Sequence, residues 1–128
     1  MRSRPAAAAT SLAVLLAGCD PSPGETTETT TIAAPCTAAT ATATTSVSLA
    51  GMMFIPYCVR VAPGAEVTFA NLDAVDHTAT ADAAQPDPFE SGLLRPGQRF
   101  AHRFGSAAAT VRVHCRLHPE MSGMVIVE

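Results

Sequence analysis

A short run near the C-terminal end of the sequence concentrates side chains that can bind a metal ion. Residues 114–121 (HCRLHPEM) include a thiol at Cys115, an imidazole at His118 and a thioether at Met121. These donors suit a copper ion that cycles between Cu(I) and Cu(II), whereas closed structural zinc sites use several Cys or His and no Met. The run therefore predicts a copper site that needs one more imidazole.

His77 is the expected source of that imidazole. It follows the turn after an apolar stretch at 67–71, so it would lie just beyond the end of a strand. Two strand ends that meet at one pole of a sandwich can bring a distant His to a short loop. We therefore expect His77 to lie beside the 114–121 run in the folded chain.

Four other residues could bind copper, but we expect structural roles for them. Strand alternation directs Cys115 into the core and His114 to the opposite face. His102 lies in an apolar stretch and is expected to be a buried histidine with a hydrogen-bond partner. Met52 and Met53 are expected to fill the core; the alternative is a soft surface through which copper is taken up.

The elements that must position these residues are strands. Apolar residues alternate with polar ones in several short segments separated by Gly, Pro, Asn and Asp, which predicts an all-β sandwich or barrel with antiparallel strands. A short helix at 79–85 could interrupt it. The alternating pairs are Val47 and Leu49, Val59 and Val61, Val67 and Phe69, Phe100 and Phe104, Val111 and Val113, and Val125 and Val127.

The N-terminal part of the sequence predicts export and anchoring. Residues 1–18 combine early arginines with a short apolar run, and the run ends in Leu-Ala-Gly before Cys19, which resembles the lipobox of bacterial lipoproteins. Cys19 would then be lipidated and would hold the protein on the extracytoplasmic face of a membrane. The Thr- and Ala-rich stretch 19–45 is expected to be a disordered tether, and the folded domain is expected at 46–128.

The two remaining cysteines, Cys36 and Cys58, are expected to form a disulfide, since an exported protein meets an oxidising compartment. The formal net charge is −3 and the chain contains no lysine. Because no basic stripe is available to neutralise phosphates, nucleic acid is excluded as the main partner.

Most of the expected domain resembles the blue copper proteins of the cupredoxin family, in their plastocyanin- and amicyanin-like form. The Cys-x2-His-x2-Met spacing from Cys115 to Met121 is the most specific part of the resemblance. Further stretches that resemble the family's strands and connections are 54–61, 63–69, 71–80, 89–100 and 123–128.

This resemblance implies a Greek-key β-sandwich of about seven to eight strands that holds one type 1 copper. The ligands carried over from the family are His77, Cys115, His118 and an axial Met121. Met124 remains an alternative axial ligand, because the longer Cys-x2-His-x5-Met spacing is close to that of plastocyanin-like loops.

The sequence departs from the family at positions around the ligands. Thr78 follows the first ligand histidine where Asn is common, Ala109 replaces a usual Gly, and Val111 and Val113 replace common aromatic residues. These departures affect the surroundings of the metal and leave the ligand set intact.

The resemblance implies an electron carrier and not an enzyme. Partner proteins would dock transiently near His118, on an apolar patch to which Pro119, Leu93 or Met124 contributes, and the protein would be a monomer. The alternative function is an extracytoplasmic copper carrier or buffer that delivers the metal to an oxidase or an exporter.

Overall fold

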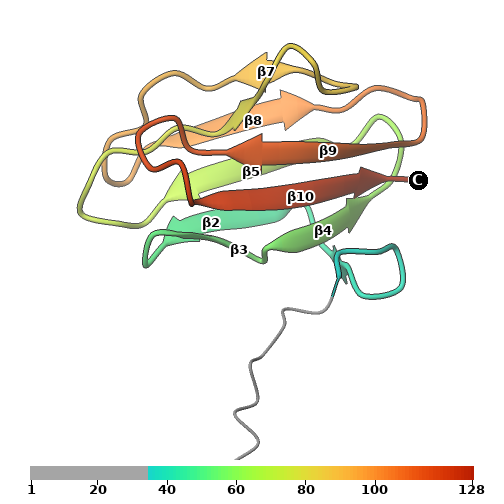
Figure 1. The fold of residues 1–128 in the computed structure, drawn as a ribbon, viewed down its shortest axis with the longest axis horizontal. Helices are drawn as coiled ribbons and strands as arrows, with labels where there is room; N and C mark the ends of the chain where they lie inside the picture. The colour runs from blue at the N-terminus through green and yellow to red at the C-terminus, as the bar shows by residue number, and fades with distance from the viewer. Residues whose placement is uncertain (1–34) are drawn as a thin grey trace, which may run out of the picture. The chain divides into compact units, whose positions relative to one another are not determined.

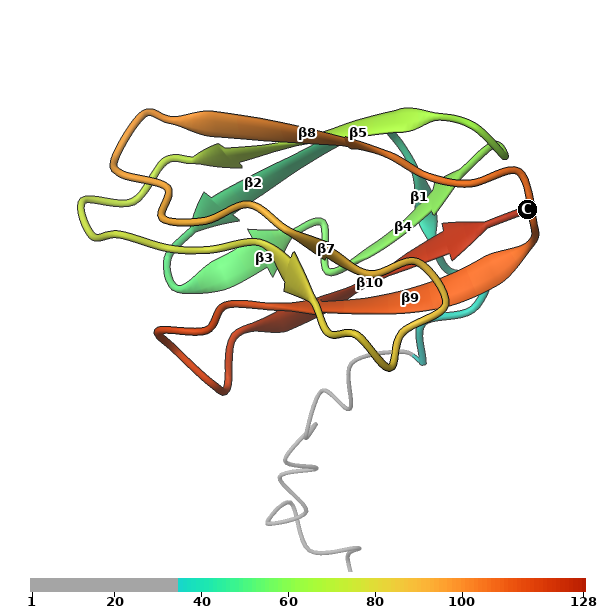
Figure 2. The same cartoon turned by 90° about the horizontal axis from the view of Figure 1, so that it is seen from above.

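The structure is a computed structural model that describes residues 35–128, and these residues form two β-sheets packed face to face (Figures 1 and 2). The six-stranded sheet has the order β1 (Thr42–Ala43), β4 (Cys58–Val61), β10 (Ser122–Val127), β9 (Ala109–His114), β6 (Thr80–Ala81) and β7 (Phe89–Glu90). The four-stranded sheet has the order β3 (Met53–Ile55), β2 (Ser46–Ala50), β5 (Glu66–Asn71) and β8 (Arg99–Arg103).

The expected all-β sandwich is confirmed, but both sheets are mixed and not purely antiparallel. β4 runs parallel to β1 and β10, and β2 runs parallel to β5. A tight hairpin can join only antiparallel strands, so parallel neighbours need a connection that leaves the sheet. Here the chain passes from β2 and β3 to β4 in the opposite sheet and then returns to β5, which lies beside β2.

The core between the sheets contains the apolar residues that predicted the strands. The buried members are Val47, Leu49, Val59, Val61, Val67, Phe69, Phe104, Val111, Val113, Val125 and Val127, while Phe100 is partly buried. Cys115 is also fully buried, on the same face as Val111 and Val113, as strand alternation predicted.

Alternation of apolar residues did not predict four of the strands, and the helix considered at 79–85 is absent from the described chain. β1, β6 and β7 contain two residues each and β3 contains three, so none is long enough to show a clear alternation. In place of a helix, β6 pairs with β7 and β9, and Ala81 is buried in the core. Alanine therefore serves here as a small core residue.

The folded unit begins earlier than the expected boundary at 46. β1 pairs with β4, and a disulfide joins Cys36 to Cys58, which confirms the expected bridge. The proposed signal peptide at 1–18 and Cys19 lie outside the described residues. Within residues 35–128, no helix has the length and apolar character needed to cross a membrane.

Candidate metal centre

The expected ligands come from two connections at the same end of the sandwich, on the left in Figure 1. His77 lies between β5 and β6, and the loop at 115–121 joins β9 to β10. The backbone of His77 exchanges two hydrogen bonds with that of Leu94, at 3.0 and 2.7 Å. The side-chain amide of buried Asn71 donates to the carbonyls of Val75 and Leu94, both at 2.8 Å, so the His77 segment is tied to its neighbours on both sides.

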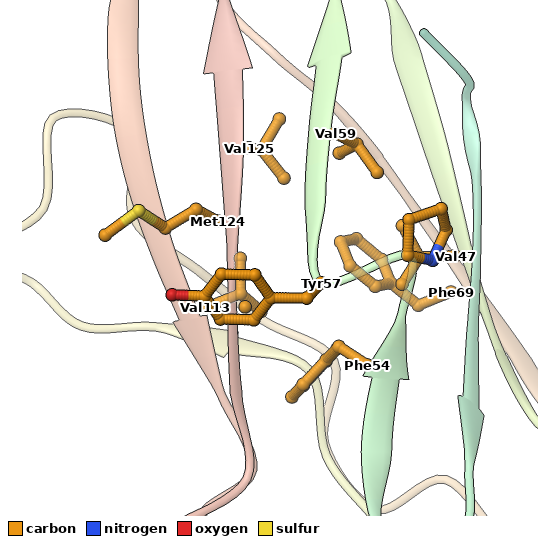
Figure 3. Close-up of a pocket in the computed structure, with 10 residues that line it drawn as sticks. Val47, Phe54, Tyr57, Val59, Phe69, Val113, Met124 and Val125 are labelled. Atoms are coloured by element: carbon orange, nitrogen blue, oxygen red, sulfur yellow. The ribbon is translucent and has the colours of Figure 1, made fainter. Parts of the chain in front are cut away.

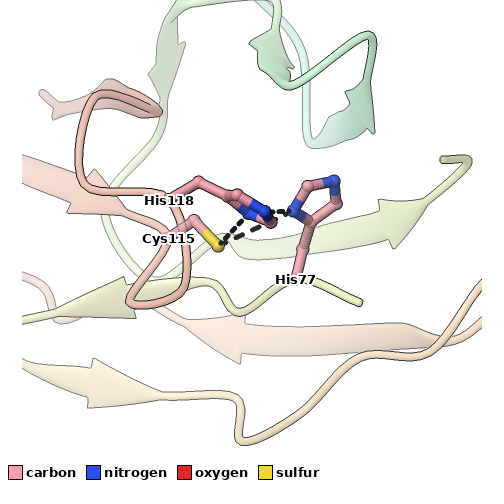
Figure 4. Close-up of side chains that lie close together, drawn as sticks. All are labelled: His77, Cys115 and His118. Atoms are coloured by element: carbon pink, nitrogen blue, oxygen red, sulfur yellow. Dashed lines mark hydrogen bonds between the residues drawn. The ribbon is translucent and has the colours of Figure 1, made fainter. Parts of the chain in front are cut away.

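Three donor atoms converge where the two connections meet (Figure 4). The Nδ1 atoms of His77 and His118 are 3.1 Å apart, and the Cys115 sulfur lies 3.6 and 3.5 Å from them. His77 and Cys115 are fully buried, whereas His118 is only partly buried. Within the described residues this is the one group of three or more His, Cys, Asp or Glu side chains arranged to hold a metal ion.

Asp73 orients the His77 ring, a role that was not predicted from the sequence. Its carboxylate oxygen Oδ2 is 2.7 Å from His77 Nε2. A neutral imidazole carries one proton, and the carboxylate acceptor places it on Nε2, which leaves the Nδ1 lone pair facing Cys115 and His118. The four-residue spacing between Asp73 and His77 was the only signal in the sequence for this contact.

The same carboxylate also holds the turn between β2 and β3. It accepts hydrogen bonds from the backbone N–H groups of Gly51, at 2.6 Å, and Met52, at 3.0 Å. The pKa of Asp73 is lowered from its ordinary value, mainly by the hydrogen bond from Met52 and next by that from His77, because these bonds favour the charged form.

Thr78 secures the segment that carries Cys115. Its backbone N–H points at the Cys115 sulfur, at 3.4 Å, and its hydroxyl accepts a hydrogen bond of 2.9 Å from the backbone N–H of Arg116. The hydroxyl also bonds to that of Thr80, at 3.0 Å. Position 78, where Asn is common in the family, therefore still links the two connections, here through the Thr78 hydroxyl.

The two methionines considered as axial ligands lie in different surroundings. Met121 is 2% exposed, and its backbone closes the ligand loop by accepting from Cys115 N–H, at 3.0 Å, and donating to the His118 carbonyl, at 2.9 Å. Met124 lies in β10 beside Tyr57, and its side chain is turned away from Val59 (Figure 3). Met121 therefore belongs to the loop that carries Cys115 and His118, whereas Met124 belongs to the strand that follows it.

The converging atoms fit a copper ion. Donors placed about 2.0 to 2.3 Å from a single ion lie roughly 3 to 4 Å from one another, which is the range found here. A thiolate with two imidazole nitrogens is a donor set that copper favours, and the surrounding core excludes water from two of the three side chains. The three residues are therefore chemically and geometrically suited to the metal that the sequence predicted.

The other candidate ligands lie outside this cluster. His114 is 3.7 Å from the Asp82 carboxylate and faces away from Cys115, as expected. His102 is only partly buried; it stacks on Phe89 with ring centroids 4.3 Å apart and contacts Asp87 at 3.0 Å, which agrees with a structural role.

The expectation that Met52 and Met53 fill the core was wrong. Their exposed fractions are 40% and 56%. Met52 lies in the tight turn between β2 and β3, and Met53 starts an edge strand of the smaller sheet, so neither position faces the space between the sheets.

Comparison with known proteins also indicates a copper-binding protein. The chain is 33% identical over 87 residues to amicyanin-alpha of Methylorubrum extorquens, covering 66% of this chain and 71% of that protein. A solved oxidized-state amicyanin mutant has a TM-score of 0.59 and 27% identity over 65% of this chain and 80% of its own. No protein-family model matches the chain.

Two further solved structures share the fold. A purple cupredoxin from Nitrosopumilus maritimus has a TM-score of 0.59 with 23% identity over 66% of this chain and all of its own. A copper-containing nitrite reductase from Thermus scotoductus has a TM-score of 0.60 and 27% identity over 65% of this chain, which spans only 22% of that enzyme. With the His77, Cys115 and His118 cluster and the amicyanin relative, these likenesses show that the chain is a copper-binding member of the cupredoxin family, similar to amicyanin.

Proposed function

We propose that this protein transfers single electrons through one type 1 copper held by His77, Cys115 and His118, with Met121 as the axial ligand. When bound, copper supplies the Cu(I)/Cu(II) couple. The observation that carries the proposal is the convergence of the Cys115 sulfur and two Nδ1 atoms within 4.8 Å of one another.

The protein contributes a ligand arrangement that changes little with the charge of the metal. His77 is fixed by Asp73 and by its backbone bonds to Leu94, and the ligand loop is closed by backbone bonds of Met121. A fixed set of soft and nitrogen donors suits both oxidation states, so gain or loss of an electron requires little rearrangement. With no open ligand position in this set, we propose an electron carrier and not an enzyme.

The exposed surface at this end suits brief contacts with redox partners. His118 is the partly exposed member of the cluster. The connections β5–β6, β7–β8 and β9–β10 lie at this end of the sandwich (Figure 2), and each carries exposed apolar residues. These residues are Leu72, Val75, Leu93, Leu117 and Pro119. A small apolar docking face favours transient complexes, in which an electron passes through the edge of the His118 ring. Met124, the third residue considered for this patch, lies away from it in β10.

We further propose that the protein acts outside the cytoplasm as a monomer anchored through lipidated Cys19. The support is the export-type sequence at 1–18 with its lipobox-like end and the Cys36–Cys58 disulfide, a bond typical of oxidising compartments. Mass spectrometry of the membrane fraction tests this proposal: it requires an acylated peptide that begins at Cys19.

The electron-transfer proposal is tested by adding Cu(II) to the purified protein. We expect an intense blue thiolate-to-copper absorption and reversible one-electron reduction. Cys115→Ser removes the thiolate and should abolish the absorption, while the control His114→Gln, on the adjacent residue that faces Asp82, should keep it. A colourless Cu(II) protein, or an unchanged spectrum in Cys115→Ser, would contradict the proposal.

The same preparation separates electron transfer from copper delivery. An electron carrier keeps its copper when a competing chelator is present and exchanges electrons rapidly with a redox partner. A delivery protein would bind Cu(I) far better than Cu(II) and release it readily to the chelator.

A further inference from the structure

Two exposed methionines lie beside the copper ligand loop, and the proposed electron transfer gives them no role. Met52 and Met53 line an open hollow of about 260 Å³ together with Met121, Glu120 and Tyr57. Met121, the axial ligand proposed above, lines this hollow as a buried residue. Two exposed methionines beside a buried third are an unusual group, since methionine usually fills irregular gaps in a core.

The backbone at Met52 has a conformation that is uncommon for a methionine. Gly51 and Met52 form the two-residue turn between β2 and β3, and both have positive φ, at 59° and 62°. Turns of this kind favour Gly or Asn at both positions, and an unbranched side chain such as that of Met is disfavoured there. Because the Met52 side chain is 40% exposed, burial provides little compensation for the strain.

Asp73 fixes this turn relative to the metal ligands. The same oxygen that contacts His77 Nε2 accepts the Met52 N–H, and the other oxygen accepts the Gly51 N–H. One carboxylate thus connects the backbone of the methionine turn to a copper ligand, so the turn is held close to the centre.

Thioethers are soft ligands that favour Cu(I) over harder divalent ions, and the carboxylate of exposed Glu120 at the rim attracts a cation. We propose that Met52 and Met53 form a second, low-affinity Cu(I) site that loads the buried centre past Met121. This inference rests on the proposed copper centre but not on electron transfer as its use.

The loading step is a ligand exchange in which no electron is transferred. Bonds from Cu(I) to the two thioether sulfurs break, and bonds to the Cys115 thiolate and the imidazoles of His77 and His118 form. The proton of the Cys115 thiol leaves to solvent. Because Cys115 and His77 are fully buried, the ion has to arrive by way of residues nearer the surface, which is the place of Met52 and Met53.

Binding is tested first, with full-length protein whose centre already holds one equivalent of Cu(I). A second equivalent of Cu(I), added without oxygen, should shift the ε-methyl NMR resonances of Met52 and Met53 and leave that of Met124 unmoved. Met52→Leu/Met53→Leu keeps the side-chain volumes but removes both sulfurs, and it should bind a single equivalent. Failure of the second equivalent to bind, or equal shifts at Met124, would overturn the proposal.

Loading is tested next by adding one equivalent of Cu(I) to the metal-free protein and then oxidising samples at intervals. The double leucine variant should acquire its blue absorption about tenfold more slowly, since it lacks the local store of metal, and should reach the wild-type spectrum. The matched control Met124→Leu should load at the wild-type rate. Equal loading rates with normal final spectra would reject the methionine site alone, whereas the lack of any blue absorption would reject the proposed centre.

Discussion

The two chain segments that meet at the centre are built differently. The segment with His77 is fully buried at the ligand and tied by side-chain bonds from Asn71 and Asp73. The 115–121 loop places a buried Cys115 next to a partly exposed His118 and is closed mainly by backbone bonds. The His77 segment therefore acts as the rigid anchor, and the loop provides the access from outside.

The site is in this way both rigid and accessible. An electron carrier needs ligands that do not rearrange and also one ligand that partners can approach. If both histidines were buried like His77, the metal would be far from any partner; if both were exposed like His118, water would reach the ligands.

The largest expected effect comes from exchanging each histidine for glycine. His118→Gly opens the site from the surface, so added imidazole should enter and restore the blue absorption. His77→Gly leaves a buried cavity that imidazole cannot reach, and we expect no restoration together with a loss of about 3 kcal/mol in the free energy of unfolding. The absorption spectrum with and without imidazole, combined with urea unfolding, measures both effects.

Equal restoration of the blue absorption by imidazole in the two glycine variants would contradict the difference between a rigid, buried His77 segment and an accessible His118 loop. That result would mean that the His77 segment opens readily in solution. His102→Gly provides the control for loss of an imidazole elsewhere, and it should keep the blue absorption without added imidazole.

The next largest effect is expected at Asp73. Asp73→Asn removes a carboxylate that accepts bonds from His77 and from the Gly51–Met52 turn, so the ring of His77 loses its fixed orientation. Copper affinity should fall by about tenfold, as for other partners of metal-binding histidines, and the thermal unfolding temperature should drop. Competition with a copper chelator measures the affinity.

Asp76→Asn is the matched control, because Asp76 lies in the same connection and its carboxylate makes no hydrogen bond to the described residues. It causes the same change of charge and should leave copper affinity unchanged. Equal losses in the two variants would mean that the net charge of the connection, and not the contact with His77, holds the ligand.

Much of this arrangement could be predicted from the sequence because it rests on local patterns. Alternation of apolar and polar residues predicted that Cys115, directly after β9, faces the core. The thiol, imidazole and thioether within 114–121 indicated copper. The short strands β1, β6 and β7 could not be predicted, since two residues carry no period and their pairing depends on neighbours far along the chain.

The rest of the site depends on contacts between distant segments. The bond between Asp73 and the Gly51–Met52 turn joins residues more than twenty positions apart, so no local pattern indicates it. Met52 and Met53 were assigned to the core by residue type, but a tight turn and an edge strand placed them at the surface. Position in the fold overrode the usual preference of methionine for the interior.

A smaller effect is expected at Thr78, which links the two segments. Thr78→Val removes the hydroxyl that accepts from Arg116 N–H and leaves that donor without its partner, so we expect a loss of about 1 kcal/mol in the free energy of unfolding. The blue absorption should remain, with a shifted band, because the Cys115 segment is less constrained. Thr78→Ser keeps the hydroxyl, so its free energy of unfolding and its absorption band should match those of the wild type. If Thr78→Ser instead lost as much stability as Thr78→Val, the methyl group of Thr78 and not its hydroxyl would be the important part.

The smallest structural effect is expected on the exposed loop, at Leu117. Leu117→Ser changes a side chain that is 49% exposed, so stability should change by less than about 0.5 kcal/mol and the copper spectrum should not change. The rate of electron exchange between molecules should still fall, because the apolar face around His118 becomes polar and brief docking is weakened. Ile55→Ser, at a similarly exposed residue in β3 and outside the ligand connections, should leave that rate unchanged. Equal rates in the two variants would place the docking surface away from His118, and the partly exposed loop would then have no advantage over a buried one.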